Sequence, residues 1–365
     1  MFNIIFAIIT SISIINGNGL DNYLEIAGEN RTEIEIALQK VPKSQAKGLV
    51  WLISNMPNED LQTLSSDFLL NNTKLAYEAW NSSPWKNSIP ENIFLDNILP
   101  YANLNEKREE WRYRFKSSFS KNIKNAKTIS EAVVILNKQI FSQLGVIYST
   151  KRPKADQSPN ESIQAGMASC TGLSILLISV CRSLGIPARF VGTPSWYNDS
   201  GNHSWVEIWD NGWHFTGAAE PVDDLLNAGW FDNYASKAVQ GHQKYGIFAV
   251  TWNPSDQYFP MDWLPGVKTY RGLDVTERYK IKDNTNLASI GFRAIDKYGF
   301  RASEKIIING PDNYLFEGRT NDESKDMNDF LTLMLPKKKY FKINIDNKSK
   351  KIFTVNDTII EFKID

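Results

Sequence analysis

The sequence predicts an α+β protein in which a helical N-terminal region precedes a mixed helix-and-sheet core and a C-terminal β-sandwich. Three observations indicate this class. Helical periodicity interrupted by prolines fills the first third of the chain, a helix that is apolar on all sides begins at Cys170, and two-residue periodicity fills residues 270–365. A chain of 365 residues is long enough for two or three domains.

Residues 1–19 are expected to be a signal peptide. The first fifteen residues are almost continuously apolar, and small or turn-forming residues follow from Asn16 to Gly19. The stretch is too short for a good membrane span. It departs from the usual signal pattern because no Lys or Arg precedes Arg31. We expect an exported protein (periplasmic, cell-surface or secreted) with no transmembrane segment after signal removal; a buried apolar strand or helix is the alternative.

Residues 20–128 are expected to form a helical region. The segment from Asn30 to Lys40 has apolar residues at positions 34, 37 and 38 with charged residues between them, which is typical of an amphipathic helix. Prolines at positions 42, 57, 84, 90 and 100 limit the helices to short lengths.

Residues 129–268 are expected to form the core. Residues 151–166 are polar and indicate a loop, and the helix from Cys170 to Leu184 is apolar on every side, which is typical of a buried central helix. Gly185 and Pro187 end it. Two strands are predicted next, from Arg189 to Gly192 and from Ser204 to Trp209. The turn Asp210-Asn211-Gly212 then leads into a return strand from Trp213 to Thr216.

Residues 269–365 are expected to form a small β-sandwich, because alternating strands recur about every ten residues. Its lysine clusters at 337–339 and 348–351 fall at predicted turns and are interpreted as solvated charge.

The whole chain has 41 basic and 41 acidic residues, so no net charge favours nucleic acid. The 11 Trp and 14 Tyr residues fill cores or form a stacking surface for a sugar or peptide. The oligomeric state stays open.

The two cysteines, Cys170 and Cys181, cannot form a disulfide with each other. Eleven residues on one helix separate them by about 16 Å, beyond the reach of a disulfide. The sequence also lacks a Cys/His ligand cluster, so neither a metal nor another cofactor is expected. Cys170 lies where a small-residue loop enters the helix, and free N–H groups with the helix dipole favour a thiolate there. Cys181 lies three turns further into apolar surroundings, which raise a thiol pKa.

His203 is the predicted base for Cys170, since it begins a strand at its loop end. His214, within the hairpin, and His242, in an aromatic-rich loop, are the other histidines. A two-residue turn at Asn211-Gly212 would place Glu220 opposite His203, close enough to orient the imidazole. A three-residue turn would place Ala219 there instead. The Cys170 N–H and the amide of Gln164, in the preceding loop, are candidate oxyanion donors.

Together these segments resemble the transglutaminase-like superfamily, whose fold and chemistry are related to papain-type cysteine proteases. The matching blocks are Ser169-Cys-Thr-Gly-Leu-Ser-Ile-Leu-Leu, Cys181-Arg-Ser-Leu-Gly-Ile-Pro-Ala-Arg-Phe-Val, Asn202-His-Ser-Trp-Val-Glu-Ile-Trp and Asn211-Gly-Trp-His-Phe. The helical N-terminal region and C-terminal β-domain are similar to those of exported bacterial members. The resemblance implies a transglutaminase-like core in which the helix carrying Cys170 packs on an antiparallel sheet. One departure is that Gly217 stands where such domains usually have the Asp of an Asp-Pro pair, and Glu220-Pro221 follows.

The resemblance implies acyl transfer from an amide through a thioester on Cys170, in peptidase, amidase or transglutaminase form. His203 would be the base, Glu220 its orienting acid and Gln164 an oxyanion donor. The substrate would be a protein or peptide. The alternative is an inactive module that binds a cell-surface peptide or glycan in an aromatic cleft formed by Trp residues. The residues of that cleft would include Trp196, Trp205, Trp230 and Trp252. A third alternative, a structural protein, predicts an inaccessible Cys170.

Overall fold

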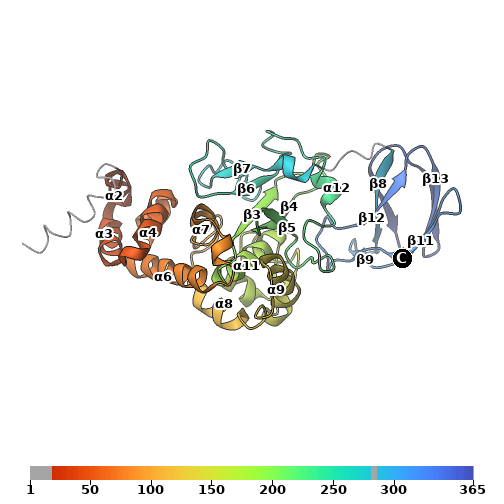
Figure 1. Ribbon diagram of the computed structural model, residues 1–365. Helices are drawn as coiled ribbons and strands as arrows, with labels where there is room; N and C mark the ends of the chain where they lie inside the picture. The colour runs from red at the N-terminus through yellow and green to blue at the C-terminus, as the bar shows by residue number, and fades with distance from the viewer. Residues whose placement is uncertain (1–18, 281–285, 365) are drawn as a thin grey trace, which may run out of the picture.

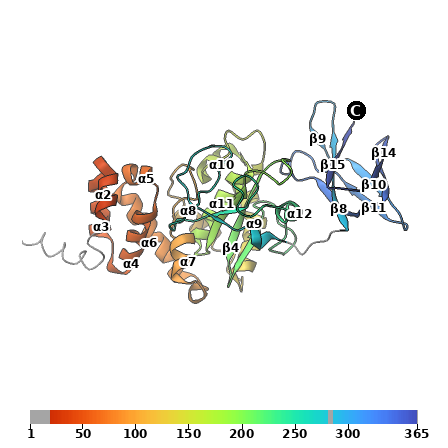
Figure 2. The same ribbon diagram turned by 90° about the horizontal axis from the view of Figure 1, so that it is seen from above.

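The computed structural model describes residues 19–280 and 286–364. Figures 1 and 2 show an elongated molecule with N-terminal helices at one end, a mixed core in the middle and two β-sheets at the other end. The predicted signal peptide lies outside the described residues except for Gly19. Among the described residues, no helix is long and apolar enough to cross a membrane.

The N-terminal region is helical, as predicted. Prolines precede several of its helices. Helices α4, α5 and α7 begin directly after Pro42, Pro57 and Pro90, respectively. The helices are α2 (Asp21–Ala27), α3 (Arg31–Lys40), α4 (Lys43–Asn55), α5 (Asn58–Thr63), α6 (Ser66–Ser82), α7 (Glu91–Asn97) and α8 (Arg112–Phe119). Their buried side chains belong to one hydrophobic cluster that continues into the central helix and sheet, so this region and the core share a common interior.

The core is a helix-on-sheet layer. Its five-stranded antiparallel sheet has the order β5-β4-β3-β6-β7. The strands are β3 (Ala188–Thr193), β4 (His203–Trp209), β5 (Trp213–Thr216), β6 (Phe248–Val250) and β7 (Gly272–Asp274). Helix α11 (Cys170–Ser183) packs against β3 and β4, and residues 171–183 are all buried. The core sheet extends through β7, beyond residue 268, where the sequence predicts its end.

Shorter elements surround this layer. They are α9 (Ile129–Leu144), β1 (Ile147–Tyr148), α10 (Pro159–Ala165), β2 (Met167–Ala168) and α12 (Asp232–Ala235). Gly185 ends the central helix region at φ +74°, and a Cβ there would lie 2.5 Å from the Ala79 carbonyl oxygen. The close approach of α6 to this turn therefore requires glycine.

The C-terminal region consists of two sheets that face each other across their own hydrophobic cluster, which agrees with the predicted sandwich. One sheet has the order β11-β10-β13-β14 and the other β12-β8-β15, with β9 paired to β8. The strands are β8 (Leu287–Ile295), β9 (Arg301–Ala302), β10 (Lys305–Asn309), β11 (Leu315–Arg319), β12 (Leu331–Pro336), β13 (Tyr340–Ile345), β14 (Lys348–Phe353) and β15 (Thr358–Lys363). The lysines at 348–351 lie within β14 and not at a turn.

Candidate active site

Cys170 is the first residue of α11, as predicted, and its side chain is partly exposed. The Ser169 side chain caps the helix by accepting a hydrogen bond from the Gly172 N–H at 3.2 Å. The first-turn N–H groups and the positive end of the helix dipole therefore lie beside the Cys170 sulfur. Cys181 differs, since burial raises the pKa of its thiol to about 12.

His203 is the first residue of β4 and is only 1% exposed. Aromatic rings enclose it: the ring centroids of Trp230 and Phe231 lie 4.7 and 4.9 Å away, and Trp205 stacks on it at 5.9 Å. The Thr171 and Ser204 hydroxyls lie 3.2 Å apart and join the start of α11 to the start of β4. This contact holds the residues next to Cys170 and His203 together.

Cys170, His203 and a third residue, Asp326, form one cluster. Their sulfur, imidazole nitrogen and carboxylate oxygen lie within 4.8 Å of one another. The contact between a nucleophile and its base is often long in a free enzyme and tightens when substrate binds, so this separation is compatible with proton transfer. The three groups are also of types that bind zinc, although no metal is required to explain their proximity.

The strand register differs from the predicted one. Trp209 pairs with Trp213, so residues 210–212 form a three-residue turn in which Asn211 has φ +57°. The predicted opposition of His203 and Glu220 across the hairpin is therefore wrong, because this register shifts the pairing by one residue. In addition, β5 ends at Thr216, before the ladder reaches His203.

Glu220 nevertheless reaches His203 by another route. After β5 the chain forms a tight turn in which Gly217 and Glu220 pair and Ala219 has φ +64°. The turn brings Glu220 Oε2 to 3.2 Å from His203 Nε2. A Cβ at Gly217 would collide with this carboxylate. The Glu220 carboxylate therefore fills the space of a side chain at position 217, where the resemblance implies Asp.

Asp326 was not predicted from the sequence. It lies between β11 and β12 of the C-terminal sandwich, is 2% exposed, and places Oδ2 at 3.7 Å from His203 Nδ1. Among the described residues, neither imidazole nitrogen has an aligned hydrogen-bond partner, so both carboxylates make ion-pair contacts. His203 therefore has one carboxylate on each nitrogen.

The carboxylates determine the charge of the imidazole. Burial opposes a charged His203, but the charge of Glu220 and polar contacts with Asp326 and Cys170 raise its pKa well above the ordinary value. Burial alone would raise the pKa of Asp326, whereas the contact with His203 holds it below the ordinary value. These directions favour an imidazolium between two carboxylates.

Tyr148 is a second residue that sequence reasoning missed. Strand β1 pairs with β2, which directly precedes Ser169 and Cys170, and Tyr148 pairs with Ala168. Burial, with the charges of Asp326 and Cys170, raises the pKa of the Tyr148 hydroxyl. Its phenol is therefore a neutral donor near the sulfur, and it is a candidate oxyanion donor.

Gln164 lies elsewhere than predicted. It is exposed on helix α10 and not in a loop, because Ser158 and Glu161 form a capping box and Pro159 begins the helix. Its role as an oxyanion donor stays a prediction.

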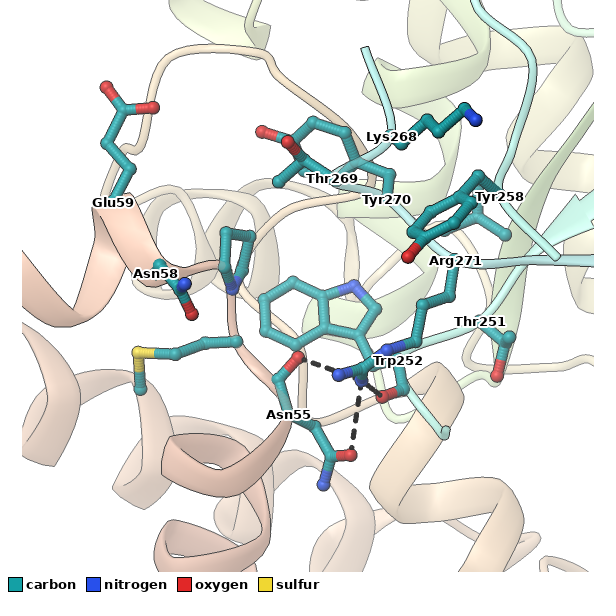
Figure 3. Close-up of a pocket in the computed structure, with 13 residues that line it drawn as sticks. Asn55, Asn58, Glu59, Thr251, Trp252, Tyr258, Lys268, Thr269, Tyr270 and Arg271 are labelled. Atoms are coloured by element: carbon teal, nitrogen blue, oxygen red, sulfur yellow. Dashed lines mark hydrogen bonds between the residues drawn. The ribbon is translucent and has the colours of Figure 1, made fainter. Parts of the chain in front are cut away.

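Most of the predicted aromatic cleft is part of the interior. Trp196, Trp205 and Trp252 are 1%, 0% and 4% exposed, and the first two pack around His203. Figure 3 shows the hollow beside Trp252, a space of about 330 Å³ between the end of α4 and the segment before β7. Arg271 crosses it to donate a hydrogen bond to the Trp252 carbonyl at 2.7 Å. Neither Cys170 nor His203 lines this hollow.

Glu207, the glutamate of the matching block Asn202-His-Ser-Trp-Val-Glu-Ile-Trp, is structural in this fold. It is fully buried and accepts hydrogen bonds from Arg189 and Arg278 at 2.6 and 2.7 Å and from the Tyr279 hydroxyl at 2.7 Å. His214 is also structural, since Asn227 and the Asp210 carbonyl contact its ring. His203 is the histidine that lies beside Cys170.

A helix-on-sheet core with a cysteine, a histidine and carboxylates at one end defines the class of this domain. Residues 117–218 match the family model of the Transglutaminase-like superfamily. The chain therefore carries a transglutaminase-like domain, as the resemblance predicted. Cys170 and His203 lie within the matched residues, whereas Glu220 and Asp326 lie beyond them. No curated protein matches the sequence.

Among the solved structures that are similar to this chain are two candidate proteases and a transglutaminase. A candidate cysteine protease from Cytophaga hutchinsonii has 21% identity and a TM-score of 0.28, over 34% of this chain and 43% of that one. A candidate protease from Parabacteroides distasonis has 9% identity and a TM-score of 0.26, over 62% and 34%. Red sea bream transglutaminase has 8% identity and a TM-score of 0.29, over 78% and 59%. This chain thus spans less than two thirds of each of these three structures.

Proposed function

We propose that the protein transfers the acyl group of a protein or peptide amide to water or an amine through a thioester on Cys170. The observation that carries this proposal is the cluster of Cys170 and His203 at the N-terminus of α11, with the Glu220 carboxylate on the imidazole Nε2 at 3.2 Å. A cysteine becomes a nucleophile when a base can hold its proton and a third group orients that base.

The reaction would proceed in two steps. The Cys170 thiolate attacks the amide carbonyl carbon, and the Cys170 N–H, with Tyr148 or Gln164, stabilises the oxyanion. The C–N bond breaks as the His203 imidazolium gives its proton to the departing amine, which leaves a thioester. Water or a second amine then attacks the thioester, and His203 accepts the proton of that nucleophile. Glu220 keeps the imidazole oriented throughout. Because water needs only an open approach, hydrolysis is favoured over cross-linking.

Catalysis is better supported than the binding alternative. Trp196 and Trp205 are buried and offer no stacking surface for a peptide or glycan. Cys170 is partly exposed, which also disfavours a purely structural role. Export through the predicted signal peptide remains part of the proposal, since an extracellular location would give access to cell-surface peptides.

The test is to trap the thioester. Peptide amides would be mixed with the protein, quenched in acid and analysed by intact-protein mass spectrometry. We expect an acyl adduct on Cys170 that hydroxylamine releases, absent in Cys170→Ala and retained in the matched control Cys181→Ala. Turnover that persists in Cys170→Ala would contradict the proposal.

A further inference from the structure

His203 contacts two carboxylates, whereas the proposed reaction requires only one. Glu220 contacts Nε2 and Asp326 contacts Nδ1, so a carboxylate faces each ring nitrogen. A histidine that takes a proton from a thiol must offer one nitrogen to that thiol. Glu220 fills the space at Gly217 where the resemblance implies the orienting acid, and Asp326 is therefore the additional group.

The segment that carries Asp326, Asn321–Asp329, is held in shape by its own domain. The Arg301 guanidinium donates hydrogen bonds to the carbonyls of Lys325, Asp326 and Asp329 at 2.7, 2.9 and 3.1 Å. Asp326 Oδ1 accepts a hydrogen bond from the Asn328 N–H at 2.9 Å. The carboxylate is thus presented by a preformed turn and not by a loose side chain.

The same segment is also docked on the core. The Asn328 side chain donates to the Asn202 carbonyl at 2.8 Å, next to His203 in the chain. The Met327 N–H donates to the Tyr148 hydroxyl at 2.9 Å. Gly201 has φ +140°, and a Cβ there would collide with the Asn328 side chain, so the core surface is shaped to receive Asn328. The Tyr148 hydroxyl, the candidate oxyanion donor, accepts this hydrogen bond and keeps its own O–H for donation.

The Asp326 carboxylate lies beside both the Cys170 sulfur and the His203 ring, on the side from which an acyl group must approach the sulfur. It lies within 4.8 Å of both the sulfur and the imidazole nitrogen. A reacting carbonyl must approach the sulfur to about 3–3.5 Å. Hydrolysis of a thioester also leaves a carboxylate at this point, so Asp326 is chemically equivalent to the acid product.

We propose that segment Asn321–Asp329 is a built-in, product-like occupant of the acyl-binding site, and that substrate enters only when this segment leaves the core. The proposal rests on the proposed function for the identity of the site. Docking of the C-terminal sandwich thus holds the enzyme closed, and the site it covers accepts a carboxylate or a carbonyl beside an imidazolium.

The test measures access to Cys170 independently of turnover. The full chain and three variants would be treated with a bulky maleimide, and labelling of Cys170 and Cys181 would be followed by peptide mass spectrometry. Asp326→Asn removes the charge, whereas Asn328→Ala removes the anchor to Asn202 and keeps the charge. Met327→Ala is the matched control, since its exposed side chain is lost while its backbone hydrogen bond remains. Circular dichroism checks that each variant is folded.

We expect Cys170 to be labelled about 10-fold faster or more in Asp326→Asn and Asn328→Ala, and at an unchanged rate in Met327→Ala and at Cys181. Amide turnover should rise in the same two variants. Faster labelling without any turnover would support the proposal that segment Asn321–Asp329 covers the site, but it would reject the proposed function. Unchanged labelling in Asn328→Ala, or loss of turnover in Asp326→Asn with labelling unchanged, would overturn the proposal.

Discussion

Two segments bring a carboxylate to His203, and they differ in origin. The turn at residues 217–220 belongs to the core and directly follows the strand that pairs with β4. The segment Asn321–Asp329 belongs to the C-terminal sandwich and is hydrogen-bonded to both domains. The first turn is held within the core, because the Asn137 side chain bonds the Gly217 carbonyl and the Ala219 N–H. The second joins two domains and, in our proposal, leaves the core as a unit. In the proposed function, Glu220 serves the reaction and Asp326 controls access to the site.

Glu220→Gln is expected to have the largest effect. It should lower kcat by about 10²- to 10⁴-fold, because the imidazole loses the carboxylate that orients it and stabilises its protonated form. Steady-state kinetics in the Asn328→Ala background, in which the site is open, measures this effect. Asp326→Asn in the same background should leave kcat within about 3-fold. Equal losses in both variants would end the distinction between the two carboxylates.

An aspartate introduced at position 217 should restore part of the activity lost in Glu220→Ala. In Glu220→Ala the space at position 217 is empty, so adding Gly217→Asp should recover at least about 10-fold of kcat by supplying an acid from the place the resemblance implies. Gly217→Ala alone should lower activity, since its Cβ collides with the Glu220 carboxylate. The comparison of kcat between the double variant and Glu220→Ala decides whether a carboxylate at position 217 is enough to restore activity.

The pKa of His203 should fall when either carboxylate is neutralised. Its folded pKa is raised above the unfolded value, so this group stabilises the fold fully below about pH 6.5 and the contribution is lost as the pH rises through the folded pKa. NMR titration of the His203 ring should show a lower pKa in Glu220→Gln, and a smaller decrease in Asp326→Asn, than in the wild type. A His203 pKa near its ordinary value in the wild type would contradict the ion-pair description.

Asp329→Asn should have the smallest effect on catalysis, and its main effect should be on the stability of the fold. Burial and the charge of Glu220 raise the pKa of Asp329 to about 7. The native state then binds a proton that the unfolded chain releases near pH 4, so ionising Asp329 destabilises the fold increasingly between about pH 4 and 7. Above pH 7 the free energy of unfolding of the variant should exceed that of the wild type, by at most about 4 kcal/mol for a shift of about three pKa units, and below pH 4 the two should match. If the variant were stabilised equally at both pH values, the ionisation of Asp329 could not be the cause of the stabilisation.

Local patterns predicted much of the fold and half of the site. The apolar run after Cys170 indicated α11, and the small residues before it indicated a cap, so the position of the cysteine followed from helix rules. The strand of His203 followed from alternation and the hairpin signal. The capping signal Ser158-Pro159-Asn160-Glu161 was present in the sequence and would have placed Gln164 on a helix.

The remaining parts depended on information that short-range patterns do not contain. The hairpin register depended on whether Asp210 joined the turn, and a change of one residue moved the pairing from Glu220 to Ala219. Glu220 still reached His203, because the turn after Gly217 redirects its side chain. Asp326 lies in another domain, and its contact depends on how two domains dock, for which no local pattern gives evidence.

The most direct test of the central claim is the pH dependence of iodoacetamide alkylation at Cys170 in the wild type and in His203→Ala, with Cys181 as the internal control. The midpoint of the profile reports formation of the thiolate, whereas the covering of the site mainly lowers the rate at every pH. The account predicts reaction below pH 7 at Cys170 that disappears without His203. A profile centred near the ordinary thiol pKa of about 8.5, or one unchanged by His203→Ala, would contradict a Cys170–His203 ion pair.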